Sequence, residues 1–226
     1  MKPRRILVGN ARSPVIVVDA FTGTVPTAID IAAALAPFPP PQRVHYPGLR
    51  RIIDERDHAA LFYVENMLQA AAPFIGGGFG IDRFDFIEAS FSLITTPPAV
   101  LAPVQRAPHF DSTDPNYLAV LHYLRAPAGS GTAFYRHRAT GFERITEARM
   151  NDYVEVAKRE SPRFAPGYIA GSNDFYEQTF MVEAVPDRLI IYQGSLLHSG
   201  IIPPGMAFSA DPRVGRLTTN IFVQAY

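Results

Sequence analysis

The chain has 226 residues, enough for one domain with a sizeable buried core. Its 21 basic and 21 acidic side chains cancel to a formal net charge of zero, which argues against nucleic acid or an anionic membrane surface as the main partner. There is no cysteine, so disulfides, thiolate metal sites and cysteine nucleophiles are excluded, and a cytoplasmic location is the simplest expectation. We also expect no signal peptide and no transmembrane helix, because no apolar run is long enough.

The N-terminal third, residues 1–83, is predicted to be a mostly helical support. Residues 15–19 read as a short buried strand, and residues 27–36 as an Ala-rich helix stopped by prolines. Residues 44–53 are predicted to be a surface loop. Asp54 is the expected cap of a helix that runs to about Ala72, where Pro73 and the glycines that follow it end the helix.

From residue 84 onwards the pattern changes to short β-type segments. Strands are predicted at 84–94, 117–124, 132–135, 179–185, 188–192 and 217–223, with one polar helix at 146–160 capped by Thr146. No internal repeat and no second-domain boundary is visible, so residues 1–226 form one predicted domain. Helices followed by strands favour an α+β fold, or an all-β barrel with helical flanks, over βαβ winding.

The chemistry centres on His109-Phe110-Asp111, which places an imidazole and a carboxylate on one face of an extended segment. These are two of the three protein ligands of a facial ferrous site, and His198 is the natural third. Taken alone, His-x-Asp is a weak indication, and the alternative is a turn in which Asp111 caps the residues after it. Downstream, Arg216 and Thr218 offer a guanidinium and a hydroxyl suited to a dicarboxylate co-substrate.

The ordered set of motifs resembles the Fe(II)/2-oxoglutarate-dependent oxygenases, in particular their prolyl-hydroxylase-like branch. The matching residues are His109-Phe110-Asp111, Tyr123-Leu124, Gly131-Thr132-Ala133-Phe134, His198 and Arg216, and they span roughly residues 84–224. The whole sequence also resembles an uncharacterised bacterial domain family with this pattern.

The resemblance implies a double-stranded β-helix, that is, a cupin-like jelly roll, over residues 84–226. It implies Fe(II) bound by His109, Asp111 and His198, and 2-oxoglutarate held by Arg216 with help from Thr218 and Tyr123. The implied reaction uses O2 to hydroxylate an amino acid, a peptide or a small metabolite, with release of succinate and CO2. Halogenating relatives replace the carboxylate ligand with a small residue, so the presence of Asp111 favours hydroxylation.

Several alternatives stay open at this point. His198 and Arg216 are 18 residues apart (216 − 198), longer than is typical of the resemblance, and Arg213 is a second candidate anchor for 2-oxoglutarate. A cupin-like metal-dependent isomerase or lyase would use the same ligands without 2-oxoglutarate. A catalytically silent jelly roll used for binding would need no metal. The sequence does not indicate the substrate or the oligomeric state.

The insert at about residues 136–173 is the predicted substrate-recognition segment, with Arg136, Arg138 and Tyr168 as its candidate contacts. A carboxylate-bearing substrate is the corollary, and a structural cover over a sheet face is the alternative. The remaining histidines have predicted structural roles. We expect His45 and His58 at the surface or in structural contacts, His122 hydrogen-bonded in the core, and His137 at a solvated strand end.

Overall fold

The structure is a computed structural model, and it describes residues 3–40 and 46–226. The strands in these ranges are β1 Arg4–Val8, β2 Ser13–Val18, β3 Gly48–Ile52, β4 Phe84–Ile94, β5 Tyr117–Arg125, β6 Gly131–His137, β7 Tyr176–Glu183, β8 Arg188–Gln193, β9 His198–Ile201 and β10 Leu217–Ala225. The α-helices are α1 Val25–Ala34, α2 His58–Phe79 and α3 Glu147–Glu160. Short 3-10 helices lie at Pro98–Val100, Pro103–Arg106 and Ser161–Arg163.

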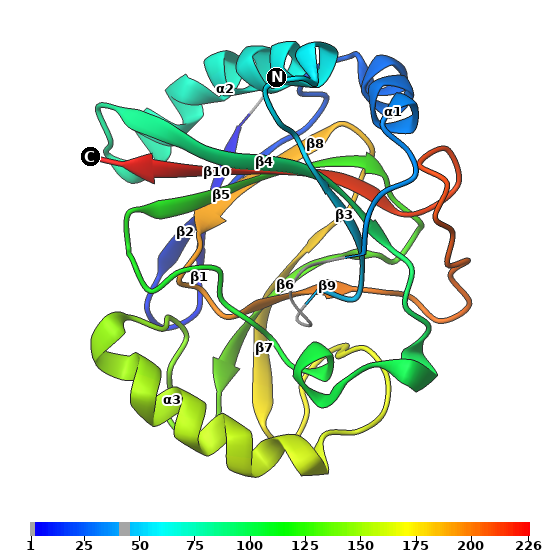
Figure 1. Cartoon of the computed structure of the whole chain (residues 1–226). Coiled ribbons are helices and arrows are strands. Elements are labelled where there is room, and N and C mark those ends of the chain that lie inside the picture. The colour runs from blue at the N-terminus through cyan, green and yellow to red at the C-terminus, as the bar shows by residue number, and fades with distance from the viewer. Residues whose placement is uncertain (1–2, 41–45) are drawn as a thin grey trace.

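The strands form two facing antiparallel sheets. The larger has the order β1-β2-β8-β5-β10-β4-β3, and the smaller has the order β7-β6-β9. Helices α1 and α2 cover the outer face of the large sheet, and α3 lies below the small one (Figure 1). This is a double-stranded β-helix, mainly β with flanking helices, which confirms the predicted fold class.

Side-chain alternation along β10 shows how the large sheet serves two purposes. Ile221 and Val223 are buried in the core beneath α1 and α2. Thr218, Asn220 and Phe222 point to the opposite face, toward the small sheet. On this inner face Thr218 is buried, whereas Asn220 and Phe222 stay partly exposed beside the candidate site.

Helix α2 extends beyond its predicted end. It continues through Pro73 to Phe79 and stops at Gly80, whose φ of 70° is a left-handed C-terminal cap. The continuation buries Ile75 completely against the sheet, and this packing outweighs the hydrogen bond lost at the proline. The N-cap is Asp57, not the predicted Asp54.

The predicted loop at residues 44–53 is wrong over most of the range that the structure describes. Gly48–Ile52 is an edge strand that pairs with β4, and residues 44–45 lie outside the described ranges. A five-residue edge strand carries little periodic signal, so tertiary pairing decides it. Strands β1 and β9 were also not predicted. The N-terminal third therefore contributes three strands to the large sheet in addition to its helices.

The histidines outside the candidate site have structural positions. His122 is fully buried between the Tyr63 hydroxyl, 2.7 Å from its Nδ1, and Asp187, 3.0 Å from its Nε2, which confirms the expected core role. His58 is exposed at the start of α2, as expected. The solvated strand end predicted for His137 is wrong, because α3 covers this ring and Glu160 pairs with it at 2.8 Å. His45 lies outside the described residues.

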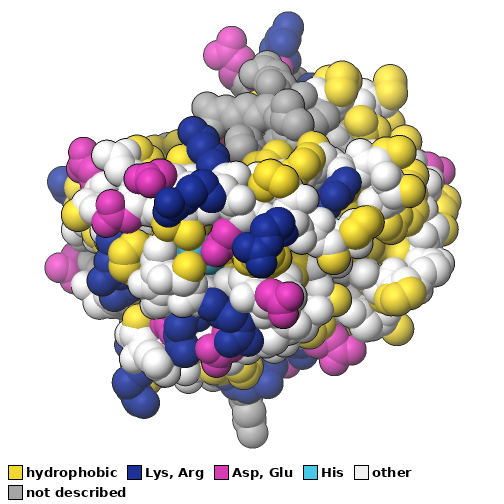
Figure 2. Space-filling model, turned by 90° about the horizontal axis from the view of Figure 1, so that it is seen from below, with side chains coloured by type: hydrophobic (Ala, Val, Ile, Leu, Met, Phe, Trp, Pro, Cys, Tyr) yellow, Lys and Arg dark blue, Asp and Glu magenta, His cyan; other side chains and the backbone are white. Residues whose placement is uncertain are grey.

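The surface carries mixed charge. Figure 2 shows basic and acidic side chains interspersed over the face seen from below, in keeping with the zero formal net charge. In the described part of the chain, no helix has both the length and the apolar character needed to cross a membrane.

Candidate metal centre

Backbone pairing brings the three candidate ligands together. His109 and His198 exchange both main-chain hydrogen bonds, N–H to O, at 2.8 Å each. The Asp111 N–H donates to the Gly194 carbonyl at 2.7 Å, in the turn just before β9. The segment that precedes β5 is therefore held against the start of β9 by the main chain, and the side chains need no metal to bring them near one another.

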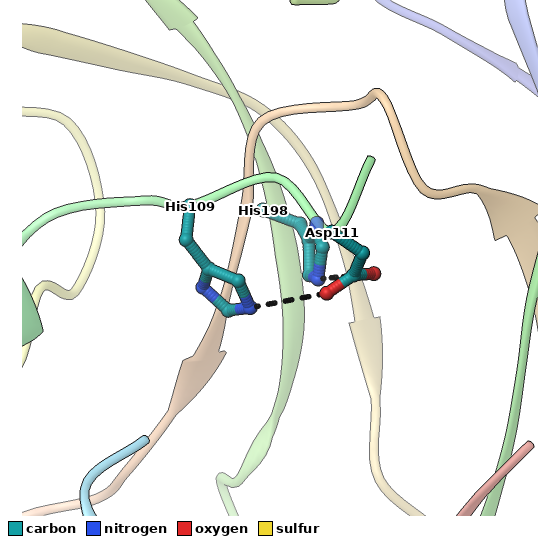
Figure 3. A group of neighbouring side chains, drawn as sticks. All are labelled: His109, Asp111 and His198. Carbon is teal, nitrogen blue, oxygen red and sulfur yellow. Dashed lines mark ion pairs between the residues drawn. The ribbon is translucent and has the colours of Figure 1, made fainter. Parts of the chain in front are cut away.

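The ligand atoms face a common point (Figure 3). Asp111 Oδ1 lies 3.7 Å from His109 Nε2, and Asp111 Oδ2 lies 3.6 Å from His198 Nε2. One ligand atom from each of the three residues can be chosen so that all lie within 4.8 Å of one another. Ligands at about 2.0–2.2 Å from one ion require separations of this order, so the triad can hold a metal.

His198 is prepared as a neutral ligand. Its Nδ1–H donates to the Leu196 carbonyl at 2.8 Å, which leaves the lone pair on Nε2, the atom that faces Asp111. Burial lowers the pKa of His198 to about 4, against the smaller opposing effect of this hydrogen bond. The imidazole is therefore uncharged at neutral pH, the form that binds metals.

Asp111 belongs to an exposed segment, but its carboxylate is largely shielded from solvent. Its side chain is 17% exposed, and burial raises the pKa of Asp111, while the positive charges of His109 and Arg50 partly oppose that rise. A metal bound between Asp111 and the histidines would compensate the desolvated charge.

The Arg216 guanidinium is a buried positive charge that could bind an anion. The residue is 5% exposed, its Nη2 donates to the Gly131 carbonyl at 3.3 Å, and its Cζ lies 5.9 Å from the centre of the Tyr123 ring. Among the described residues its buried Nε has no hydrogen-bond partner, and no carboxylate lies within ion-pair distance. A buried guanidinium without a counter-charge is costly, so the geometry fits an anionic ligand.

The Arg216 guanidinium lies beside the strand residue two positions after the ligand His198. A Cβ placed on Gly200 would lie 3.9 Å from Arg216 Nη2, and Gly200 follows His198 by two residues on the same face of β9. Two residues of strand span about 7 Å. An extended five-carbon diacid bridges a similar distance, so the triad and Arg216 can bind opposite ends of one 2-oxoglutarate.

The other predicted co-substrate residues surround Arg216. Thr218 is buried two residues further along β10. The Tyr123 hydroxyl contacts Thr132 Oγ1 at 2.6 Å. Arg213, the alternative anchor, instead makes an exposed ion pair with Asp30 at 2.8 Å. The structure therefore places Arg216, not Arg213, in the interior.

The predicted substrate residues of the insert are dispersed. Arg136 is paired with Glu143 at 2.7 Å and with Glu177 at 3.0 Å, and Arg138 Nε donates to the Asn173 carbonyl at 2.8 Å. These contacts hold the insert to its own sheet. Tyr168 is closer to the candidate site, because it packs in the cluster of Ile94, Ile202 and Met206 and feels the charge of Arg216.

A set of hydrogen-bonded polar side chains on the inner face of β3 and β4 was not predicted from the sequence. Arg50 Nε donates to Ser90 Oγ at 2.8 Å, and Asn220 Nδ2 donates to Ser92 Oγ at 2.8 Å. Alternating serines in Ser90-Phe91-Ser92 were the only available signal. Arg50 went unrecognised because its segment was predicted to be a loop.

Comparisons with known proteins agree with this fold. The prolyl hydroxylase of Trichoplax adhaerens, solved in complex with a hypoxia inducible factor peptide fragment, is 13% identical, with a TM-score of 0.54 over 93% of this chain and 83% of that one. The viral collagen prolyl hydroxylase of Paramecium bursaria Chlorella virus-1, solved as a 2OG complex, is 12% identical, with a TM-score of 0.52 over 94% and 96%. The α-ketoglutarate-dependent epimerase SnoN of nogalamycin biosynthesis is 11% identical, with a TM-score of 0.55 over 94% and 78%.

The fold is therefore the double-stranded β-helix, and the solved structures similar to this chain include two prolyl hydroxylases and a non-heme α-ketoglutarate-dependent epimerase. More particularly, residues 1–223 match the profile of DUF6445, a family of unknown function, and the chain belongs to that family. No curated protein matches the sequence.

Proposed function

We propose that this protein is an Fe(II)- and 2-oxoglutarate-dependent oxygenase that hydroxylates a small molecule or a peptide. The proposal rests on two features that lie next to each other on one face of β9, a possible metal site and a possible anion site. A carboxylate–histidine triad suited to a divalent metal lies at His198, and a buried guanidinium without a counter-charge lies beside Gly200.

The residues have separate tasks in this proposal. His109, Asp111 and His198 would hold Fe(II), next to the 2-oxo acid end of 2-oxoglutarate. Arg216 receives the distal carboxylate, and Thr218 and Tyr123 lie beside it. Bound Fe(II) and 2-oxoglutarate would supply the oxidation: O2 would give one oxygen atom to succinate and the other to a substrate C–H bond, with loss of CO2.

The carboxylate ligand and the apolar environment of His198 favour hydroxylation over other outcomes. Asp111 occupies the position that halogenating relatives leave to a small residue. The buried rings of Phe134 and Tyr192 lie beside His198, and this apolar environment limits the access of water to that ligand.

The test is 2-oxoglutarate turnover by anaerobically iron-loaded protein after oxygen is admitted, with succinate and CO2 as the measured products. Wild type should convert 2-oxoglutarate slowly without a prime substrate, and Asp111→Ala should not. A cupin-like isomerase or lyase would bind metal but show no 2-oxoglutarate consumption and no dependence on Arg216. A silent binding protein would retain no metal when it is purified without oxygen.

A further inference from the structure

The inner face of the large sheet is open beside the metal triad. Strands β10 and β4 are interior strands, yet Asn220, Phe222 and Glu88 on their inner face are only partly buried. Their outer-face neighbours are buried beneath α1 and α2. Because these side chains keep part of their surface exposed, a ligand can reach this region, which forms one wall of the opening to the site.

Contacts between neighbouring side chains connect the metal ligand Asp111 to this wall. A Cβ placed on Gly194 would lie 3.2 Å from Asp111 Cβ and 2.8 Å from Tyr117 Cδ1, so these two side chains are neighbours. The Tyr117 ring stacks on Phe222 with centroids 5.3 Å apart. The Arg50 guanidinium lies 5.6 Å from the centre of the Phe222 ring.

Arg50 is held in one orientation. Its Nε donates to Ser90 Oγ at 2.8 Å, and its Nη2 donates to Glu88 Oε1 at 2.6 Å. The Arg50 and Glu88 side chains are 29% and 34% exposed, so solvent or a ligand reaches both charges. A guanidinium fixed by a ring, a hydroxyl and a carboxylate loses little further freedom on binding a ligand.

The charge balance of the pair selects the kind of ligand. A simple anion would have to compete with Glu88 for Arg50 and would leave the Glu88 charge partly buried and unpaired. A molecule with a carboxylate next to an ammonium keeps both charges compensated, since its carboxylate meets Arg50 and its ammonium meets Glu88. A free α-amino acid has this arrangement.

We propose that the substrate of the site is a free α-amino acid, bound through its carboxylate to Arg50 and through its ammonium to Glu88, with its side chain directed along Phe222 and Tyr117 toward the triad. This inference rests on the proposed function for its chemical consequence, but the binding itself requires no turnover. It differs from the prediction that Arg136 and Arg138 contact the substrate, because both arginines are engaged within the insert and its sheet.

The experiment screens the proteinogenic L-amino acids against protein loaded with Zn(II) and 2-oxoglutarate, with saturation-transfer NMR as the readout. At least one amino acid should bind, and its C-terminal amide and its N-acetyl form should each bind about tenfold more weakly or worse, the scale of one charge-assisted hydrogen bond. The analogue series uses wild-type protein, so it does not depend on whether a variant folds.

Arg50→Gln and Glu88→Gln should each lower the affinity for the same amino acid by about tenfold or more, while the affinity for 2-oxoglutarate stays unchanged. Arg213→Gln, which breaks the exposed pair with Asp30, is the matched control and should bind as wild type does. The proposal is overturned if no amino acid binds, if the amide and N-acetyl forms bind as well as the parent, or if Arg50→Gln has no effect.

Failure of this inference is distinguishable from failure of the proposed function. Turnover of 2-oxoglutarate without any amino-acid binding would support the oxygenase function and refute the amino-acid site. Amino-acid binding that depends on Arg50, in protein that never consumes 2-oxoglutarate, would support the amino-acid site and refute the oxygenase function.

Discussion

His109 and His198 are paired through both of their backbone hydrogen bonds, at 2.8 Å each, although 88 residues (198 − 109) separate them in the chain. Their rings lie 4.3 Å apart between centroids. The main chain alone therefore preorganises two of the three candidate ligands, and metal binding needs only small side-chain adjustments.

Removal of the anionic ligand should abolish metal binding. Asp111→Ala leaves two neutral imidazoles, and we expect the affinity for Fe(II) to fall by more than about 100-fold, since even outer-sphere partners of metal ligands contribute about 10–100-fold. Anaerobic titration calorimetry measures this affinity. Asp30→Ala, at an exposed ion pair, is the control, and undiminished binding in Asp111→Ala would refute the ligand assignment.

Loss of the buried guanidinium should affect the co-substrate and not the metal. Arg216→Ala should weaken 2-oxoglutarate binding by about 2–5 kcal/mol, roughly 30-fold to several thousandfold. Arg213→Ala should leave it unchanged because that side chain is engaged at the surface. Titration of 2-oxoglutarate into the Zn(II)-loaded variants gives the comparison, and the opposite ranking would move the anchor to Arg213.

Gly200 should act as a spacer between the triad and Arg216. Gly200→Val places two methyl groups beside the Arg216 guanidinium, in the room that the co-substrate needs. We expect 2-oxoglutarate affinity to fall more than tenfold while metal binding persists. Gly77→Ala, where a Cβ would meet nothing within 4 Å, serves as the control. Normal co-substrate affinity in Gly200→Val would place the diacid elsewhere.

Asp187 should make stability depend on pH in the acid range. Burial raises its pKa, but hydrogen bonds from His122, from Thr22 and from the Gly23 N–H outweigh burial, and the net pKa lies well below the usual value. A carboxyl group with a lowered pKa in the folded state stabilises the protein above its unfolded pKa of about 3.9 and loses that contribution as pH falls.

Asp187→Asn should therefore lower the free energy of unfolding by about 1–3 kcal/mol at pH 7. The difference from wild type should shrink as the pH falls below about 4. Urea unfolding at a series of pH values measures both quantities. Asp30→Asn controls for a surface carboxylate, and a difference that did not change with pH would exclude the linkage.

Arg136 should act on stability and not on substrate. Glu143 accepts hydrogen bonds from the main-chain N–H groups of Asn10 and Ala11, at 2.9 Å each, and Arg136 neutralises it. Arg136→Ala leaves this 6% exposed carboxylate without its cation and should cost about 1–3 kcal/mol of unfolding free energy. Arg138→Ala, at an exposed side chain, should cost less. A selective effect of Arg136→Ala on substrate coupling at full stability would restore the recognition role.

Local signals in the sequence were sufficient for most of the strands after residue 84, for α3 and for the candidate ligands His109 and Asp111, whereas His198 was predicted from the order of motifs along the chain. Apolar alternation predicts β5, β8 and β10 because each has one face against a core, and His109-Phe110-Asp111 needs only the two-residue repeat of an extended chain. The same two-residue repeat predicts that Arg216, just before β10, and Thr218, on β10, point to one side of the sheet. These features depend on neighbours in sequence.

Only the tertiary structure decided what depends on distant segments. β3 is a strand because β4 offers it a free edge, and α2 runs past Pro73 because Ile75 packs on the sheet. The choice of Arg216 over Arg213 follows from which guanidinium the two sheets enclose. The Arg50–Glu88 pair beside the opening arises from strand register between β3 and β4. Burial and register are set by which segments meet in space, and the local pattern of residues does not contain that information.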